Sequence, residues 1–369
     1  MRRITAGLAI SLALLAPTLL VACGDDDAPA DADAGIDAGY QPWELDLLDG
    51  EQGFSLRTPE FDVAAGAELQ DCYFVEVPDL DGGNDLWIDR AVTAINPGSH
   101  HTNVFHVGEI RDLDPADGTA IDLGGGLQGT FISEGECWKS PNWAGWPIVA
   151  NSQNSSIDDP LTDWQLPDNV AMRFAPGEML MLQVHYVNAT TQTTPFRGKV
   201  GVNFYRSGDV APMELGTLFA TQQSIRICES APEPSYHGTC ALPAGDFTVV
   251  AANGHFPSRG KKFSIFAWDG VSIDEPLAAA QFYESDAWDE PPMELDLDVA
   301  LPENGGIWWT CDYQWQEPIA SVGCDTLNAN DPQGAGDCCY TFGGKVEQNE
   351  HCNVFMYYYP KAVGNITCN

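Results

Sequence analysis

The sequence has few basic residues for its length. Lys and Arg number 16 against 54 Asp and Glu in 369 residues, which gives a formal net charge of -38. A nucleic-acid backbone would repel such a chain, so nucleic acid is excluded as a partner, and a basic patch for anionic lipid is not expected either. We interpret the acidic surface as a feature that keeps an exported protein soluble.

The chain also contains no G-x-S-x-G elbow, no P-loop and no dinucleotide-binding fingerprint, so hydrolase and nucleotide-dependent activities have little support. No long helical period follows residue 23, whereas Gly and Pro number 36 and 25. Short segments with β-branched or aromatic alternation, such as 179–186 and 354–359, recur between turn-rich stretches. This pattern predicts an all-β protein made of two tandem antiparallel β-sandwich domains of jelly-roll type.

The first 23 residues predict an export signal. They contain a pair of arginines, an apolar run and the ending LVAC, which is typical of a bacterial lipoprotein signal peptide with lipid attached to Cys23. The run is short for a membrane anchor, which is the less favoured alternative. Residues 24–45 are acidic and poor in apolar side chains, so they predict a disordered tether.

The residue after Cys23 indicates the destination of the protein. Gly24, rather than Asp, resembles lipoproteins that are sent to the outer membrane. We therefore expect an outer membrane lipoprotein, facing the periplasm or the cell surface, that contacts the membrane only through its N-terminal lipid. The sequence leaves the oligomeric state open.

Ten cysteines remain once Cys23 is set aside from the eleven. An even number in an exported chain predicts disulfides. No C-x-x-C pair occurs, and the adjacent Cys338 and Cys339 cannot easily bridge each other, so metal binding by thiolate is the less favoured interpretation.

Three histidines form the strongest functional signal. His100 and His101 are adjacent in GSHHTNVFHV, and His185 lies in the strand-like MLMLQVHYVN. Adjacent strand residues point to opposite faces, so both histidines can bind one ion only if the strand twists or bulges there or lies between sheets. Three imidazoles suit copper or zinc. His106 is on the face of His100 by period two, and we expect it beside the site or on the surface.

The amino-acid sequences of these segments resemble those of a known family. HHTNVF, the LQVHY of residues 182–186, the segment 350–353 followed by VFMYYYP, and Cys368 beyond it resemble the copper type II ascorbate-dependent monooxygenases, which include peptidylglycine alpha-hydroxylating monooxygenase and dopamine beta-hydroxylase. The resemblance extends from Cys72 to the end. It implies one copper site in each sandwich, and the Gly- and Pro-containing segment 206–213 predicts that the sandwiches occupy 46–208 and 209–369.

In this family the first site is an electron-transfer copper, which the resemblance places at His100, His101 and His185. The catalytic copper takes an H-x-H pair and a methionine. Here the corresponding residues are Asn253-Gly254-His255 and His351. Either His255 and His351 hold copper with the Asn253 oxygen or water as third ligand, which gives two ions per chain, or Asn253 marks a lost site and His255 is a solvated loop residue.

The resemblance also implies disulfides and one substrate contact. It pairs Cys240 with Cys368 and Cys311 with Cys352. For the other six cysteines it gives no rule, although Cys72 with Cys137 is one candidate. Of the family's anchors for a substrate carboxylate only Asn353 is present, because the arginine and the tyrosine are replaced. Without the cationic fork, a peptide C-terminus is not expected as substrate.

Three functions follow, in order of preference. The first is an exported copper-dependent monooxygenase that hydroxylates an unknown small molecule with dioxygen and a small reductant such as ascorbate, with catalysis at His255 and His351. The second is a non-catalytic copper-binding or electron-transfer lipoprotein that retains only the first site. The third is a metal-free surface domain, against which the histidine trio argues.

Overall fold

The computed structural model covers the chain, and the residues that it describes are 43, 45–96, 98–108, 110, 113–133, 145–154, 160–188, 196–209, 211–288, 291–318, 325–326, 336–343 and 349–369. The predicted signal peptide with Cys23, nearly all of the tether, Cys137 and Cys324 lie outside these residues. No helix within the described ranges has the length and apolar character needed to span a bilayer.

The predicted fold class is confirmed, because the described elements are strands and two short 3-10 helices, η1 (Pro115–Asp117) and η3 (Ala278–Ala280). The strands of the first half are β1 (Gly53–Arg57), β2 (Phe61–Val63), β3 (Glu68–Glu76), β4 (Leu86–Ile95), β5 (Ser99–His106), β6 (Thr119–Asp122), β7 (Gln128–Ile132), β8 (Ile148–Ser152), β9 (Leu161–Gln165), β10 (Val170–Phe174), β11 (Met179–Val187), β12 (Phe196–Gly198), β13 (Val200–Arg206) and β14 (Met213–Glu214). Those of the second half are β15 (Gly216–Gln222), β16 (Arg226–Cys228), β17 (Ser235–Ala241), β18 (Thr248–His255), β19 (Gly260–Trp268), β20 (Gln281–Ser285), β21 (Val299–Ala300), β22 (Gly306–Tyr313), β23 (Asp325–Thr326), β24 (Cys338–Phe342), β25 (Asn349–Glu350), β26 (Cys352–Tyr359) and β27 (Ile366–Cys368).

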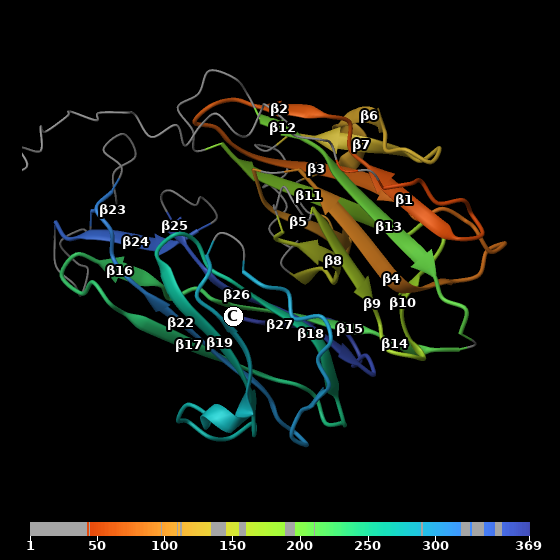
Figure 1. The fold of residues 1–369 in the computed structure, drawn as a ribbon. Helices are drawn as coiled ribbons and strands as arrows, with labels where there is room; N and C mark the ends of the chain where they lie inside the picture. Colours follow the sequence, from red (N-terminus) through yellow and green to blue (C-terminus); the bar gives the residue numbers. More distant parts are fainter. Residues whose placement is uncertain are drawn as a thin grey trace, which may run out of the picture. The chain divides into compact units, whose positions relative to one another are not determined.

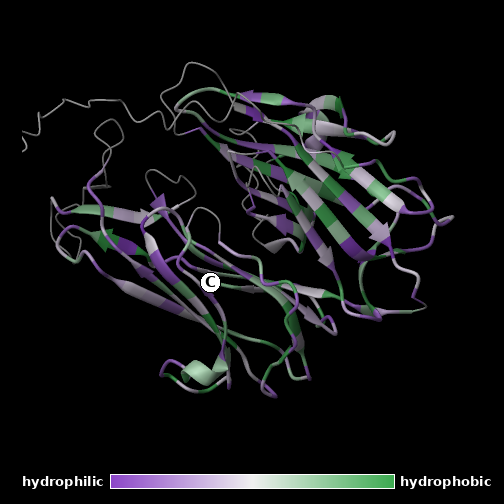
Figure 2. Ribbon diagram, in the orientation of Figure 1, coloured by the Kyte–Doolittle hydropathy of each residue, from purple (hydrophilic) through white to green (hydrophobic). Residues whose placement is uncertain are grey.

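The first half contains two six-stranded sheets (Figure 1). One has the order β1-β13-β4-β10-β14 with β9 also paired to β4, and the other has the order β6-β7-β3-β11-β5-β8. Their buried side chains form one apolar core. Green and purple or white segments alternate along many strands in Figure 2, as expected for sheets with one face toward a core. β14 pairs with β10, so the first sheet includes residues up to Glu214.

The second half contains a five-stranded sheet, β21-β18-β26-β15-β27, and a four-stranded sheet, β17-β22-β19-β20. A further small sheet has the order β16-β24-β23, with β25 paired to β24. The five-stranded sheet is apolar on both faces. Leu218 and Val354 belong to the core of the second half, whereas their strand neighbours Phe219 and Phe355 belong to the core of the first.

This alternation determines which way β18 directs its side chains. Ala251 belongs to the core of the first half and Ala252 to that of the second. By period two, Asn253 and His255 lie on the same face as Ala251. The last residues of β18 are therefore directed toward the first half of the chain.

Three disulfides stabilise the second half among the described residues. Cys240 is bonded to Cys368, and Cys311 to Cys352, so both pairings implied by the resemblance are confirmed. Cys228 is bonded to Cys339, which lies directly opposite on β24. Cys72 is also disulfide-bonded. Its candidate partner, Cys137, is outside the described residues.

Candidate metal centre

A β-bulge at His100 brings two adjacent histidines together. β11 lies between β3 and β5, and His185 of β11 pairs with His101 whereas the next residue, Tyr186, pairs with Ser99. His100 is thus an extra residue in the ladder, and a bulge of this kind turns its side chain away from strict alternation. The ring centres of His100 and His101 are 5.3 Å apart, and those of His185 are 4.9 Å and 4.8 Å from them. The bulge that two adjacent ligands require is therefore present.

His255, at the end of β18, joins the same group. Its ring centre is 4.8 Å from that of His100 and 5.3 Å from that of His101. His351, between β25 and β26, has its ring 4.8 Å from that of His255. The five histidines therefore form one cluster. The resemblance had implied a separate copper site in each sandwich. The difference arises because the face of β18 that carries His255 is directed toward the first half.

Three of the five rings are oriented by a protein group at one nitrogen. His185 Nε2 lies 2.9 Å from Glu68 Oε1 and 3.2 Å from the Gln70 side-chain amide, and His351 Nδ1 donates to the Gly343 carbonyl at 3.0 Å. His255 Nδ1 donates to Gln153 Oε1 at 2.9 Å. A carboxylate or a carbonyl can only accept here, so each contact places the ring proton on that nitrogen and leaves a lone pair on the other.

The remaining nitrogens lack hydrogen-bond partners among the described residues. They are His100 Nε2, His101 Nδ1, His185 Nδ1 and His255 Nε2, and all four are buried. The candidate ligand nitrogens of His100, His101 and His255 lie within 4.8 Å of one another. A buried polar atom without a partner costs about 1–3 kcal/mol, and a transition metal that accepts imidazole ligands would remove this cost. The donor set therefore fits a metal of the copper or zinc type.

Burial keeps these imidazoles neutral. Loss of hydration lowers the pKa of His100, His101 and His255 well below the ordinary value, and repulsion from neighbouring imidazoles acts in the same direction. Burial likewise lowers the pKa of His351 to about 4. A metal binds the neutral imidazole, so at pH 7 these four rings are in the form that a metal requires.

Asn253 is hydrogen-bonded at both ends of its amide. Its Oδ1 accepts a hydrogen bond from Gln153 Nε2, and its Nδ2 donates to the Pro292 carbonyl at 3.0 Å. Its role as a metal ligand stays a prediction. Asn253 fixes the orientation of Gln153, whose Oε1 is thereby left to hold His255.

Two other predicted residues are placed as follows. Asn353 lies opposite His255 in the β18–β26 ladder, and its Oδ1 is buried without a hydrogen-bond partner among the described residues. Its role toward a substrate stays a prediction. His106 is half-buried, packs edge-on against Phe174 at 4.6 Å between ring centres and lies 4.0 Å from Glu178.

Sequence reasoning missed the groups that orient the histidines. Glu68 and Gln153 carry no motif, and their proximity to His185 and His255 follows from strand pairing and sheet packing. A further missed feature is the buried ion pair of Arg259 Nη1 with Glu350 Oε1 at 2.9 Å, directly before His351 in the sequence. The Arg259 guanidinium also lies over the Tyr340 ring, 3.4 Å from its centre.

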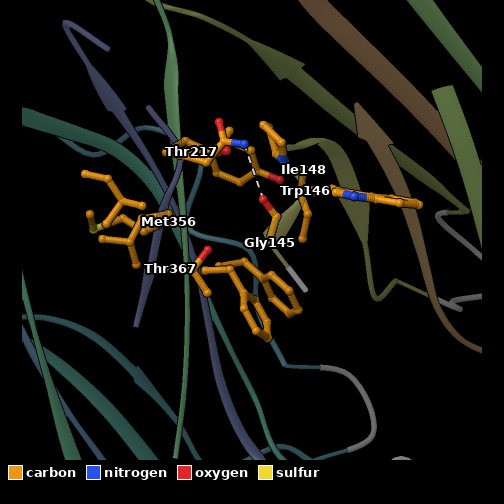
Figure 3. Close-up of a pocket in the computed structure, with 13 residues that line it drawn as sticks. Gly145, Trp146, Ile148, Thr217, Met356 and Thr367 are labelled. Atoms are coloured by element: carbon orange, nitrogen blue, oxygen red, sulfur yellow. Dashed lines mark hydrogen bonds between the residues drawn. The ribbon is translucent and has the colours of Figure 1, made fainter. Parts of the chain in front are cut away.

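Two of the hollows between described residues of the first and second halves bear on the site. The one drawn in Figure 3, between Trp146 and Ile148 on one side and Thr217 and Met356 on the other, has a volume of about 10 Å³. It can hold at most a water molecule. The other is a cleft of about 610 Å³. Its lining includes Gln153, Leu161, Thr162, Pro291, Met293 and Leu295. Clefts of this size accommodate small molecules, and its wall includes the residue that holds His255.

Comparison with known proteins assigns no family. No protein-family model matches the chain, and no curated protein matches it. Among solved structures, the major capsid protein P2 of bacteriophage PM2 aligns at a TM-score of 0.27 and 10% identity, over 82% of this chain and 96% of that one. A putative secreted protein of Eubacterium rectale aligns at a TM-score of 0.19 and 10% identity, over 79% of this chain and 71% of that one. A structure of infectious bursal disease virus (Gx strain) aligns at a TM-score of 0.16 and 8% identity, over 84% of this chain and 77% of that one.

Proposed function

We propose that this protein is an exported copper-dependent monooxygenase that hydroxylates a small molecule with dioxygen and a small reductant such as ascorbate. The observation that supports it is that the candidate ligand nitrogens of His100, His101 and His255 lie within 4.8 Å of one another, each residue having a buried ring nitrogen with no hydrogen-bond partner among the described residues. Imidazole ligands without thiolates suit copper among the redox-active metals. The proposal also rests on the resemblance of the histidine segments to the copper type II monooxygenases.

Residues of this chain would perform three tasks. Glu68 and Gln153 hold the rings of His185 and His255 in the tautomer that presents a lone pair. The apolar surroundings exclude water from the ligands and keep them unprotonated. Bound copper would supply the redox chemistry, passing electrons from the reductant to dioxygen.

The cleft beside Gln153 is the proposed place for the substrate. It has a volume of about 610 Å³ and includes apolar side chains such as Leu161, Met293 and Leu295. Among the described residues that line it, the one carboxylate is that of Asp163, which is paired with Arg90 at 2.6 Å. A neutral, partly apolar substrate fits this lining better than a carboxylate does.

A test measures oxygen consumption by the full mature chain after copper loading. With ascorbate and a panel of neutral small molecules, we expect uptake that depends on both copper and substrate. The His101→Ala variant should lose it. The His237→Ala variant is the control, because His237 is exposed and stacks on Trp308, 4.6 Å between ring centres. Copper binding without uptake across the panel would refute the enzymatic proposal.

The alternative function is a copper-binding or electron-transfer lipoprotein. The sequestered amide of Asn253 favours it, because this residue stands where the family has a copper ligand and has both ends engaged by protein groups. This alternative predicts tightly bound copper that exchanges electrons with small reductants and oxidants but does not consume oxygen.

The proposed location is the outer membrane, with the protein held by lipid on Cys23. Metabolic labelling with a fatty acid tests this in a bacterial host. We expect label in the membrane fraction for the full chain and neither label nor membrane association for the Cys23→Ala variant.

A further inference from the structure

We infer that the five histidines serve one composite metal centre, in which His255 from the second half completes a site begun by His100 and His101 of the first, and that the chain binds one copper ion rather than one per sandwich. This inference rests on the proposal that the protein binds copper. It concerns how many ions are bound and by which residues, and it holds whether or not oxygen is consumed.

The first argument is the spacing of the rings. Imidazoles that bind one ion through nitrogens at about 2.0 Å have ring centres about 4.5–5.5 Å apart when the bond angles lie between about 90° and 120°. The three distances among His100, His101 and His255 are 5.3, 4.8 and 5.3 Å. The rings drawn from both halves are thus spaced as the ligands of a single ion are.

The position of His185 supports the same centre. Its ring lies 4.9 Å from that of His100 and 4.8 Å from that of His101. These values fall within the range for ligands of one ion. His185 therefore packs against two of the ligand rings and has a buried Nδ1 without a hydrogen-bond partner among the described residues. It is not one of the three residues whose candidate ligand nitrogens all lie within 4.8 Å of one another, so we place it beside the ion.

The second argument is that the first half orients the ligand of the second. His255 Nδ1 donates to Gln153, which follows β8, and Gln153 in turn donates to Asn253 of β18. The tautomer of His255 is therefore set by a residue from the other half of the chain.

The third argument is electrostatic. Imidazole ligands carry no negative charge, and the one carboxylate with a hydrogen bond to any ring of the cluster among the described residues is Glu68. Two divalent ions a few ångströms apart in this buried place would repel each other strongly with little compensating charge. One ion agrees better with this charge balance.

We do not expect His351 to be a ligand of the composite centre. Its ring contacts the ring of His255 at 4.8 Å. It is not among the three residues whose candidate ligand nitrogens all lie within 4.8 Å of one another. We therefore assign it to the edge of the site, where it packs against His255 and is held by the Gly343 carbonyl.

The experiment is copper analysis of the full mature chain, loaded with copper and freed of excess ion. We expect one copper per chain, fewer than about 0.1 in His101→Ala and in His255→Ala, and one in His351→Ala and in the surface control His237→Ala. Near-ultraviolet circular dichroism of each metal-free variant establishes that it has folded. Electron paramagnetic resonance of the Cu(II) form should give one signal whose nitrogen splitting changes in the His185→Ala variant.

Two coppers per chain, with one retained in each of His101→Ala and His255→Ala, would overturn the composite centre while leaving the proposed function intact. One copper that is lost in both variants, together with no oxygen uptake, would support the centre and refute the monooxygenase. Absence of copper binding by the folded chain would overturn both.

Discussion

His255 donates its Nδ1 proton to Oε1 of Gln153 at 2.9 Å, which links the last residue of β18 to the residue that follows β8. Because Gln153 also donates to Asn253, its amide cannot turn without losing a hydrogen bond. The lone pair of His255 Nε2 is consequently fixed toward the rings of His100 and His101. Gln153, which is not itself a proposed ligand, thus controls the orientation of the His255 ring.

Replacing Gln153 should weaken copper binding without removing a ligand. We expect Gln153→Ala to lower copper affinity about 10- to 100-fold, because His255 would lose the acceptor that fixes its tautomer. Gln153→Glu keeps an acceptor oxygen, so its copper affinity should fall less than that of Gln153→Ala. Competition with a copper chelator measures the affinities. Gln165→Ala is the matched control, since this glutamine is exposed and bonds only to backbone carbonyls. Equal affinities for Gln153→Ala and this control would contradict the assigned role.

Glu68 should strengthen the binding of metal beside His185. A carboxylate that accepts from an imidazole N–H raises the basicity of the opposite nitrogen. We expect Glu68→Gln to lower copper affinity about 10-fold, as the amide can accept the hydrogen bond but carries no charge. Glu76→Gln, at the exposed end of the same strand, should leave the affinity unchanged. An unaltered chelator titration for Glu68→Gln would show that the carboxylate does not act on the metal.

The metal-free protein should lose stability as the pH falls below about 6.5. Burial lowers the pKa of His351 to about 4 and that of His106 to about 3, so both groups bind more protons in the unfolded chain than in the folded chain between these values and about 6.5. The lowered pKa values of His100, His101 and His255 act in the same direction, whereas the pKa of Glu350, which burial raises to about 7, opposes them. The contribution of the histidines is complete above pH 6.5 and decreases as the pH falls toward 4. For His351 alone, the full loss is on the order of 3 kcal/mol.

Urea unfolding at several pH values between 7.5 and 4.5 measures this effect. The His351→Asn variant, which cannot titrate, should show a shallower decrease than the native chain. A decrease that is as steep in His351→Asn as in the native chain would mean that His351 is more solvated than its burial indicates.

Much of the local structure was accessible from the sequence. Alternation in stretches such as 179–186 follows directly from one face being buried, and β11 occupies 179–187. Side chains alternate along a strand, so two adjacent histidines can bind one ion only with an irregularity such as a bulge. The pairing of β5 with β11 contains a bulge at His100. The pairings of Cys240 and Cys311 came from the resemblance rather than from physical reasoning. Cys228 with Cys339 was not foreseen, because nothing local links residues that are 111 positions apart.

The proximity of His255 to His100 could not be predicted from the sequence. The apolar character of Phe219 and Phe355 predicts burial, but a strand pattern does not say which core each face contacts. In the structure both residues pack in the core of the first half, and this packing directs His255 toward His100. Similarly, Asn253 was expected to be a ligand because of its position in an H-x-H-like segment. The Gln153 side chain that occupies its oxygen comes from a distant segment.

The buried ion pair between Arg259 and Glu350 should be strongly destabilising when only one partner is removed. The side chains are 5% and 0% exposed, so Arg259→Met leaves a carboxylate without its charged partner in the interior. We expect a loss of about 3–5 kcal/mol in the free energy of unfolding. The double variant Arg259→Met with Glu350→Leu should recover most of it, since apolar side chains of similar size replace both charges. Denaturant unfolding of the single and double variants measures the effect.

An exposed ion pair provides the comparison. Arg197 and Glu60 are 3.2 Å apart with side chains 70% and 44% exposed, so Arg197→Met should cost less than about 1 kcal/mol. The position of Glu350 directly before His351 gives a second readout. If the ion pair positions the start of β26, the Arg259→Met variant should also alter the Cu(II) resonance spectrum through the displaced ring of His351. Equal losses of stability in the Arg259 and Arg197 variants would show that the interior pair is solvated.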